Sequence, residues 1–174
     1  MLRDGLLDGL TVAFAGEAAP ISDACARLGA ATPALRADAA AEEAVAAEVA
    51  RLGAPDTLVC ATAPAFAAAG GGLDGLRVAA DAAFVATRAV ANAWIAGARG
   101  GKVVLLAPGP DAAPLRASLE NLARSLSVEW ARFGIRPTAI LPGVATADED
   151  VATLVAFLAS RGGDYYSGCA FTLR

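Results

Sequence analysis

The chain of 174 residues contains no histidine and only one lysine, Lys102. Without histidine it cannot form a Ser–His or Cys–His nucleophile pair, nor any metal site that needs imidazole ligands. Its 14 basic residues are outnumbered by 18 acidic ones, so the formal charge is −4 and there is no basic field to attract nucleic acid. These absences exclude histidine-dependent chemistry and argue against nucleic-acid binding.

Long hydrophobic runs and paired cysteines are also missing. Charges and glycines interrupt the apolar stretches before they could span a bilayer, and Asp4 and Asp8 interrupt the start, where a signal peptide would need an apolar core. The cysteines are odd in number and far apart, namely Cys25, Cys60 and Cys169. We therefore expect buried, reduced thiols in a cytoplasmic protein, with no disulfide framework, no metal site and no membrane partner.

Short apolar runs alternate with long alanine-rich stretches along the whole chain. The length fits a single domain covering residues 1–174. Strands that are apolar throughout are typical of a parallel sheet covered on both faces, so the pattern predicts an α/β, doubly wound, Rossmann-like fold with about six strands. The predicted strands are 10–16, 31–36, 56–62, 102–107, 136–141 and 167–173; the predicted helices are 20–28, 40–52, 73–98, 113–133 and 149–160; residues 65–72 are predicted to be a loop.

Several segments carry a family resemblance in the correct order. Residues 117–143, ASLENLARSLSVEWARFGIRPTAILPG, resemble the sixth helix and strand of short-chain dehydrogenases/reductases. DTLVCATAP, GGKVVLLAP and FLASRGGDYYSGCAFTL resemble three other segments of that family. The resemblance implies a Rossmann-like oxidoreductase scaffold that binds NAD(P) and oligomerises through its two long helices.

The catalytic positions that the resemblance implies are vacant. The family uses a tyrosine, a lysine four residues later, a serine at the end of the preceding strand and a helix asparagine. These positions fall at Ala112, Arg116, Ala107–Pro108 and about Ala79. Because the only lysine is Lys102 and both tyrosines lie near the C-terminus, no Tyr-x-x-x-Lys can occur at all, and we predict no catalytic residues.

The turn that holds the coenzyme in this family, Gly-x-x-x-Gly-x-Gly, is also altered. Gly16 remains, whereas Pro20 and Ser22 replace the other two glycines. Proline removes an N–H that could point at phosphate, and the carboxylate of Glu17 repels a pyrophosphate. Cys60 begins the segment that replaces the family's Asn-Asn-Ala-Gly. We expect no cofactor in this chain and NAD(P) in a partner subunit.

The chain is shorter than the resemblance requires. Residues 29–38 leave room for one strand, so we expect one strand–helix unit of the family to be missing, and with it much of an adenine pocket. The substrate lid between Pro142 and Glu149 is cut to a few residues, and the sequence ends at Arg174 without the usual Asp-Gly-Gly.

Five polar residues have both a ligand-binding and a structural interpretation. Asp38 follows Gly16 at about the 20-residue spacing of a ribose-binding acid, but we expect it to cap a helix. Arg36 could meet a 2′-phosphate, and Thr62 and Ser22 could donate to a ligand; we expect a solvated arginine and turn or cap roles instead. Cys60 ends a central strand, where ligand crevices lie, but is expected to be a small hydrophobe.

On the two long predicted helices, the side chains outside the stripe that must cover the sheet are also small and apolar. This pattern favours contact with another subunit. The alternative is that alanine merely fills their surface. The tyrosine pair could belong to an active site, but a subunit interface is favoured. The candidate interface residues are Val78, Ala82, Val85, Ala89, Trp94, Leu119, Leu122, Leu126, Trp130, Tyr165 and Tyr166.

Three functions remain open from the sequence. The favoured one is a non-catalytic subunit that pairs, in a dimer or tetramer, with an intact short-chain dehydrogenase and shapes its structure or substrate pocket. The second is a homo-oligomeric pseudoenzyme that binds or senses a small ligand. The third is a reductase with rearranged chemistry that uses Tyr165 or Tyr166.

Overall fold

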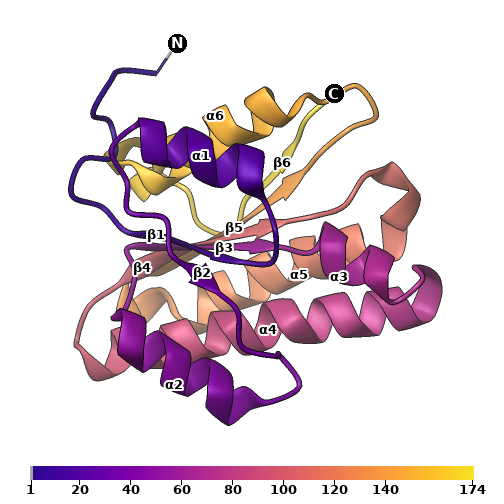
Figure 1. The fold of residues 1–174 in the computed structure, drawn as a ribbon, viewed down its shortest axis with the longest axis horizontal. Coiled ribbons are helices and arrows are strands. Elements are labelled where there is room, and N and C mark those ends of the chain that lie inside the picture. The colour runs from indigo at the N-terminus through magenta and orange to yellow at the C-terminus, as the bar shows by residue number, and fades with distance from the viewer. Residues whose placement is uncertain (1) are drawn as a thin grey trace.

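The computed structural model describes residues 2–174, which form one parallel sheet with helices on both faces (Figure 1). The strand order is β2-β1-β3-β4-β5-β6, and every pairing is parallel. The strands are β1 (Val12–Ala15), β2 (Ala34–Leu35), β3 (Thr57–Ala61), β4 (Gly101–Leu106), β5 (Ile135–Leu141) and β6 (Ala170–Thr172). The helices are α1 (Ala19–Arg27), α2 (Glu42–Leu52), α3 (Ala63–Ala68), α4 (Gly72–Ala96), α5 (Ala113–Glu129) and α6 (Asp148–Ala159).

The sheet separates two hydrophobic cores. On one face, α1 and α6 pack against each other and over the strands; on the other face lie α2, α4 and α5 (Figure 1). Alternate residues of a strand point to opposite faces, so Leu58 and Leu105 enter the core under α4 while Val59 and Val104 enter the core under α6. This arrangement explains why β3 and β4 are apolar throughout, and it confirms the predicted doubly wound α/β class.

The edge of the sheet confirms the expected shortening. β2 is the edge strand, and α2 leads from it directly to β3. The common Rossmann order has one more strand outside the second one. Within the described residues, the segment 29–38 holds β2 alone, as expected, so one strand and one helix of the family order are missing and β2 ends the sheet.

The loop predicted at 65–72 was wrong. Residues 63–68 form α3, which starts with a proline in its first turn and is otherwise mostly alanine, the best helix former. The helix is held by close packing, because a Cβ on Gly75 of α4 would lie 2.7 Å from the carbonyl oxygen of Phe66. The long predicted helix 113–133 also ends earlier, at Glu129, and a 3-10 helix, Ala131–Phe133, follows it.

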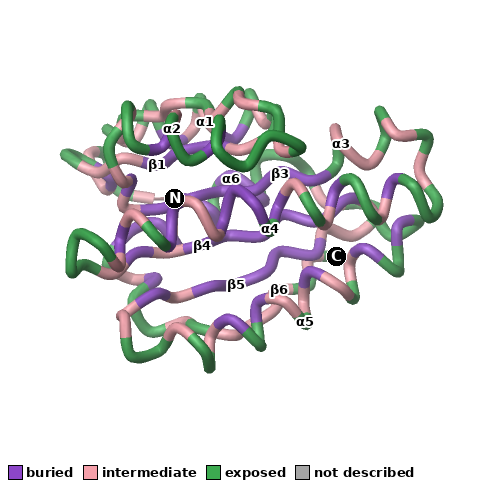
Figure 2. Tube along the Cα trace, turned by 90° about the horizontal axis from the view of Figure 1, so that it is seen from below, coloured by how far each residue is buried: buried purple, intermediate pink, exposed green. Residues whose placement is uncertain are grey.

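Burial follows the layers. The strands and the inner sides of the helices are buried, and the outer sides of α4 and α5 are exposed (Figure 2). Among residues 2–174, no helix combines the length and hydropathy needed to cross a bilayer.

Candidate ligand crevice at the carboxyl edge of the sheet

The turn after β1 is shaped by contacts within the chain. Gly16 has a φ of +89°, and a Cβ there would lie 2.2 Å from the carbonyl oxygen of Ala61, so only glycine fits. In the first turn of α1, the Ser22 hydroxyl donates to the carbonyl of Ala19 at 3.1 Å, the local role expected for it. Pro20 and Glu17 are exposed beside it. The close approach of Ala61, the last residue of β3, therefore requires glycine at position 16, independently of any ligand.

A small cavity lies between this turn, β3 and α4. Its volume is about 120 Å³, and most of its lining is alanine methyl groups together with Leu35, Val45 and Cys60. An apolar cavity of about 150 Å³ in another protein accepts a molecule of benzene size, so this space suits only a small apolar ligand. Its walls offer few polar groups to orient a ligand.

Cys60 is buried in that wall as an unreactive thiol. Its Sγ lies 3.8 Å from the carbonyl oxygen of Ala83 and 3.5 Å from the Thr87 hydroxyl. Burial raises the pKa of Cys60 to about 12, and burial likewise raises the pKa of Cys25 to about 11. Both thiols are therefore neutral at physiological pH, as expected for small hydrophobes. Cys169 departs from the prediction because it is only partly buried.

Thr62 joins two strand ends rather than capping a helix. It is the residue before α3, but its side chain makes no capping bond. Its hydroxyl donates to the carbonyl of Leu106 at 2.8 Å, and its backbone N–H donates to the same oxygen at 3.1 Å. Thr62 is structural, but the turn or cap role expected for it was wrong, because its partner is in β4, which the local sequence could not reveal.

At the end of β2, backbone groups that could meet a ribose are taken by a carboxylate of α2. Glu48 Oε2 accepts from the N–H groups of Arg36 and Ala37, both at 2.8 Å. Asp38 accepts from the Ala40 N–H at 2.9 Å and so closes a turn before α2. The expectation that Asp38 caps the helix was wrong, because α2 begins only at Glu42. The side chain of Arg36 is solvated, as expected.

Arg116 stands where the resemblance places the family lysine, and it serves as a clamp. Its Nη1 donates to the carbonyls of Pro108 and Pro142, both at 2.7 Å. Pro108 follows β4 and Pro142 follows β5, so one guanidinium ties the carboxyl ends of two neighbouring strands together. The Arg116 guanidinium thus donates to backbone carbonyls of its own chain. Ala112, which stands where the resemblance places the family tyrosine, is buried.

The predicted interface residues divide sharply once the chain is folded. Four of them lie inside the chain's own core and are corrections: Val85, Trp94, Leu119 and Leu126. The large apolar residues of these helices face the sheet. In the sequence, an apolar stripe that covers a sheet looks the same as one that contacts another subunit, so these residues were wrongly assigned to an interface. Four more are half-buried: Ala82, Ala89, Leu122 and Trp130. Of the predicted residues on these two helices, only Val78 is exposed, at 49%. The prediction missed three other exposed apolar residues, Leu73 and Phe84 on α4 and Val128 on α5.

The tyrosine pair lies far from the crevice. Tyr165 ends a 3-10 helix, Arg161–Tyr165, and is 91% exposed. Its neighbour Asp164 bonds Lys102 at the start of β4, which is the amino edge of the sheet. The Tyr166 ring makes edge-on contacts with Phe157 and Phe171, at centroid distances of 5.8 and 5.4 Å. Neither phenol can act at the carboxyl edge, which argues against the rearranged reductase.

The crevice lacks several of the free donors with which a dinucleotide would be bound. The first turn of α1 lacks one N–H at Pro20, and the exposed Glu17 lies in the loop just before the helix, where an anion would need donors. The N–H groups after β2 are already bonded to Glu48, and the cavity is lined by methyl groups. No chemical step through NAD(P) follows from these residues.

No family model matches the chain, and no curated protein matches its sequence. Among solved structures it is similar to BdcA (YjgI) from E. coli, with a TM-score of 0.77 and 23% identity over 97% of this chain and 100% of that one. It is similar also to a short chain dehydrogenase from Mycobacterium smegmatis, with a TM-score of 0.77 and 21% identity over 99% of this chain and 95% of that one. The chain therefore has the fold of the short-chain dehydrogenases.

Proposed function

We propose that this chain is a non-catalytic member of the short-chain dehydrogenase/reductase family that assembles with an intact subunit of that family. The partner would supply tyrosine, lysine, serine and NAD(P), and this chain would supply a packing surface and help to shape the partner's substrate pocket. The observation that carries the proposal is the clamp at Arg116. The residue at the family's lysine position binds Pro108 and Pro142, so it holds the scaffold together instead of serving a substrate.

The exposed sides of α4 and α5 support an assembly role. Val78 and Phe84 on α4 are 49% and 39% exposed, and Val128 on α5 is 79% exposed. The two helices contact each other within the chain, so their outer sides lie on one face of the molecule (Figure 2). From these exposed apolar side chains on two neighbouring helices we infer a subunit interface. An obligate interface buries roughly 2,000–5,000 Å², enough to cover both helices.

Native mass spectrometry tests the assembly. The chain is expressed alone, and also together with short-chain dehydrogenases encoded by neighbouring genes. We expect a mixed dimer or tetramer in the second preparation. V128D should abolish the mixed species, because a carboxylate at that position would be buried in the interface without a partner.

V144D is the matched control, since Val144 is 92% exposed and lies in the loop after β5, outside both helices. It should leave the mixed oligomer intact. Circular dichroism spectra must show that both variants fold. A chain that stays monomeric in every co-expression overturns the proposal. A stable homo-oligomer that excludes the intact subunits also overturns it, in favour of the homo-oligomeric pseudoenzyme.

A further inference from the structure

The amino edge of the sheet carries a groove with a charge opposite to that of the whole molecule. The groove lies between the starts of β3, β4 and β5 and the segment after α6, and its volume is about 310 Å³. Its cationic side chains are Arg99, Lys102, Arg136 and Arg161, and its carboxylates are Asp56 and Asp164. The groove therefore has an excess of two positive charges in a chain whose formal charge is −4.

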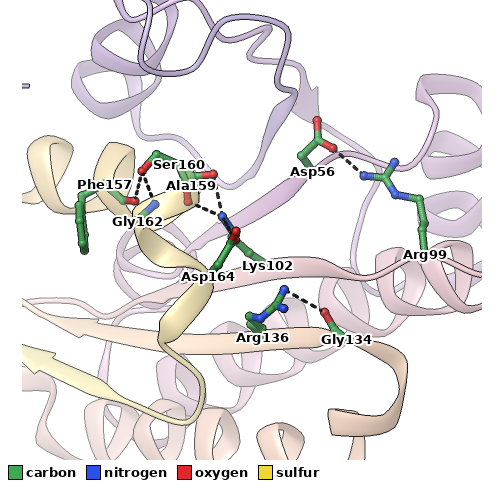
Figure 3. A network of polar contacts seen from close by, with 10 residues as sticks. All are labelled: Asp56, Arg99, Lys102, Gly134, Arg136, Phe157, Ala159, Ser160, Gly162 and Asp164. Carbon is green, nitrogen blue, oxygen red and sulfur yellow. Dashed lines mark hydrogen bonds and ion pairs between the residues drawn. The ribbon is translucent and has the colours of Figure 1, made fainter. Parts of the chain in front are cut away.

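Two of the cations are neutralised by the two carboxylates. Arg99 Nη2 pairs with Asp56 Oδ1 at 2.6 Å, and Lys102 Nζ pairs with Asp164 Oδ1 at 2.8 Å (Figure 3). Lys102 also donates to the carbonyls of Ala159 and Ser160, so its three donors are used. These contacts anchor the segment after α6 to the start of β4.

The other two cations are not neutralised. Within residues 2–174, Arg161 has no ion pair, and Arg136 has only a long hydrogen bond, 3.5 Å, to the carbonyl of Gly134 (Figure 3). Arg136 is the register partner of Lys102 on the neighbouring strand, so the two side chains leave the same face of the sheet. Two like charges directly opposite each other on neighbouring strands destabilise a sheet. The hydrogen bond from Lys102 lowers the pKa of Asp164, and the charges of Arg136 and Arg161 lower it further.

We propose that this groove binds a small polyvalent oxyanion, carrying phosphate or carboxylate groups, between Arg136 and Arg161. Guanidinium groups bind both kinds of oxyanion in bidentate fashion, and an anion of two or three negative charges would offset the local excess of positive charge. The site lies at the opposite edge of the sheet from the crevice, so it is independent of the function proposed above.

Isothermal titration calorimetry on the full chain tests the site, with inorganic pyrophosphate and citrate as probes at about 0.1 M ionic strength. We expect saturable binding of one equivalent with a Kd of about 1 mM or tighter. The tighter of the two probes identifies phosphate or carboxylate as the preferred group. The R136Q/R161Q variant should weaken binding about tenfold or more, while R3Q/R77Q, which removes two exposed arginines elsewhere, should leave it unchanged.

Nuclear magnetic resonance of the wild-type protein keeps the proposal testable if the double variant fails to fold. The side-chain Nε–H signals of Arg136 and Arg161 should move as pyrophosphate is added. Equal weakening in both double variants, shifts confined to other arginines, or no saturable binding of either probe would each overturn the site.

Discussion

At the scale of single residues, Arg116 is the side chain whose replacement is most informative. It is partly buried, and its guanidinium bonds two backbone carbonyls, at Pro108 and Pro142. R116M leaves both oxygens without that donor, so we expect the free energy of unfolding to fall by about 1–3 kcal/mol. Urea denaturation measures the change.

The control for this prediction is R77M, because Arg77 is an exposed residue of α4. Its effect should stay within about 0.5 kcal/mol. Hydrogen exchange provides a second measurement, since the amides of residues 143–147 should exchange faster in R116M. If R116M matches R77M in both experiments, the clamp is irrelevant to stability.

The buried thiol of Cys60 predicts how stability depends on pH. Burial raises the native pKa of Cys60 from 9.0 to about 12, so above pH 9 the unfolded chain loses this proton while the native chain keeps it. The contribution is complete below pH 9 and is lost as the pH rises toward 12. Loss of this contribution reduces the free energy of unfolding by at most about 1.4 kcal/mol per pH unit.

Urea denaturation of the wild type and C60A between pH 7 and pH 10.5 checks this dependence. The wild type should lose stability more steeply above pH 9, because C60A lacks the titrating group. Identical slopes would contradict the burial of Cys60 as a neutral thiol.

At pH 8 a thiol reagent should label the partly buried Cys169 before the two buried cysteines.

At the scale of elements, Trp94 anchors the C-terminal end of α4 next to the sheet. Trp94 is fully buried, and its Nε1 donates to the carbonyl of Pro55 at 2.6 Å. A Cβ on Gly101, the first residue of β4, would lie 2.2 Å from the indole ring. The absence of a side chain at Gly101 therefore allows the Trp94 ring of α4 to pack against the start of β4. The orientation of α4, and with it of the proposed assembly surface, depends on this contact.

G101A should displace the indole and lower the free energy of unfolding by about 1–3 kcal/mol, the usual cost of overpacking. The near-ultraviolet circular dichroism of tryptophan should change with it. G109A is the matched control, since a Cβ there meets only the flexible side chain of Asp111, at 3.2 Å. An unchanged tryptophan spectrum in G101A would show that the packing is loose.

At the scale of the whole molecule, the altered turn after β1 and the shortened sheet are the two reasons to expect that this chain binds no coenzyme. We expect no saturable binding of NADH or NADPH up to about 1 mM, followed by the fluorescence of the reduced nicotinamide. An intact dehydrogenase of this fold serves as the positive control. Micromolar binding to this chain alone would overturn the proposal of a non-catalytic subunit and restore the reductase interpretation.

The sequence by itself determined the α/β class, the number of strands and the missing strand–helix unit. Apolar runs bounded by glycine and proline mark buried parallel strands, and a gap of a few residues cannot hold an extra strand and helix. It also determined that no Tyr-x-x-x-Lys exists, because composition alone excludes it.

Only the tertiary structure decided which side of each long helix is free. Val85, Trp94 and Leu126 look like a docking stripe in the sequence, yet they fill the chain's own core, while Val128 remains exposed. The clamp at Arg116 and the cationic groove at the amino edge were likewise hidden, because their partners come from segments distant in the chain. Local pattern reports which residues avoid water, and the packing of the whole chain decides what each of them meets.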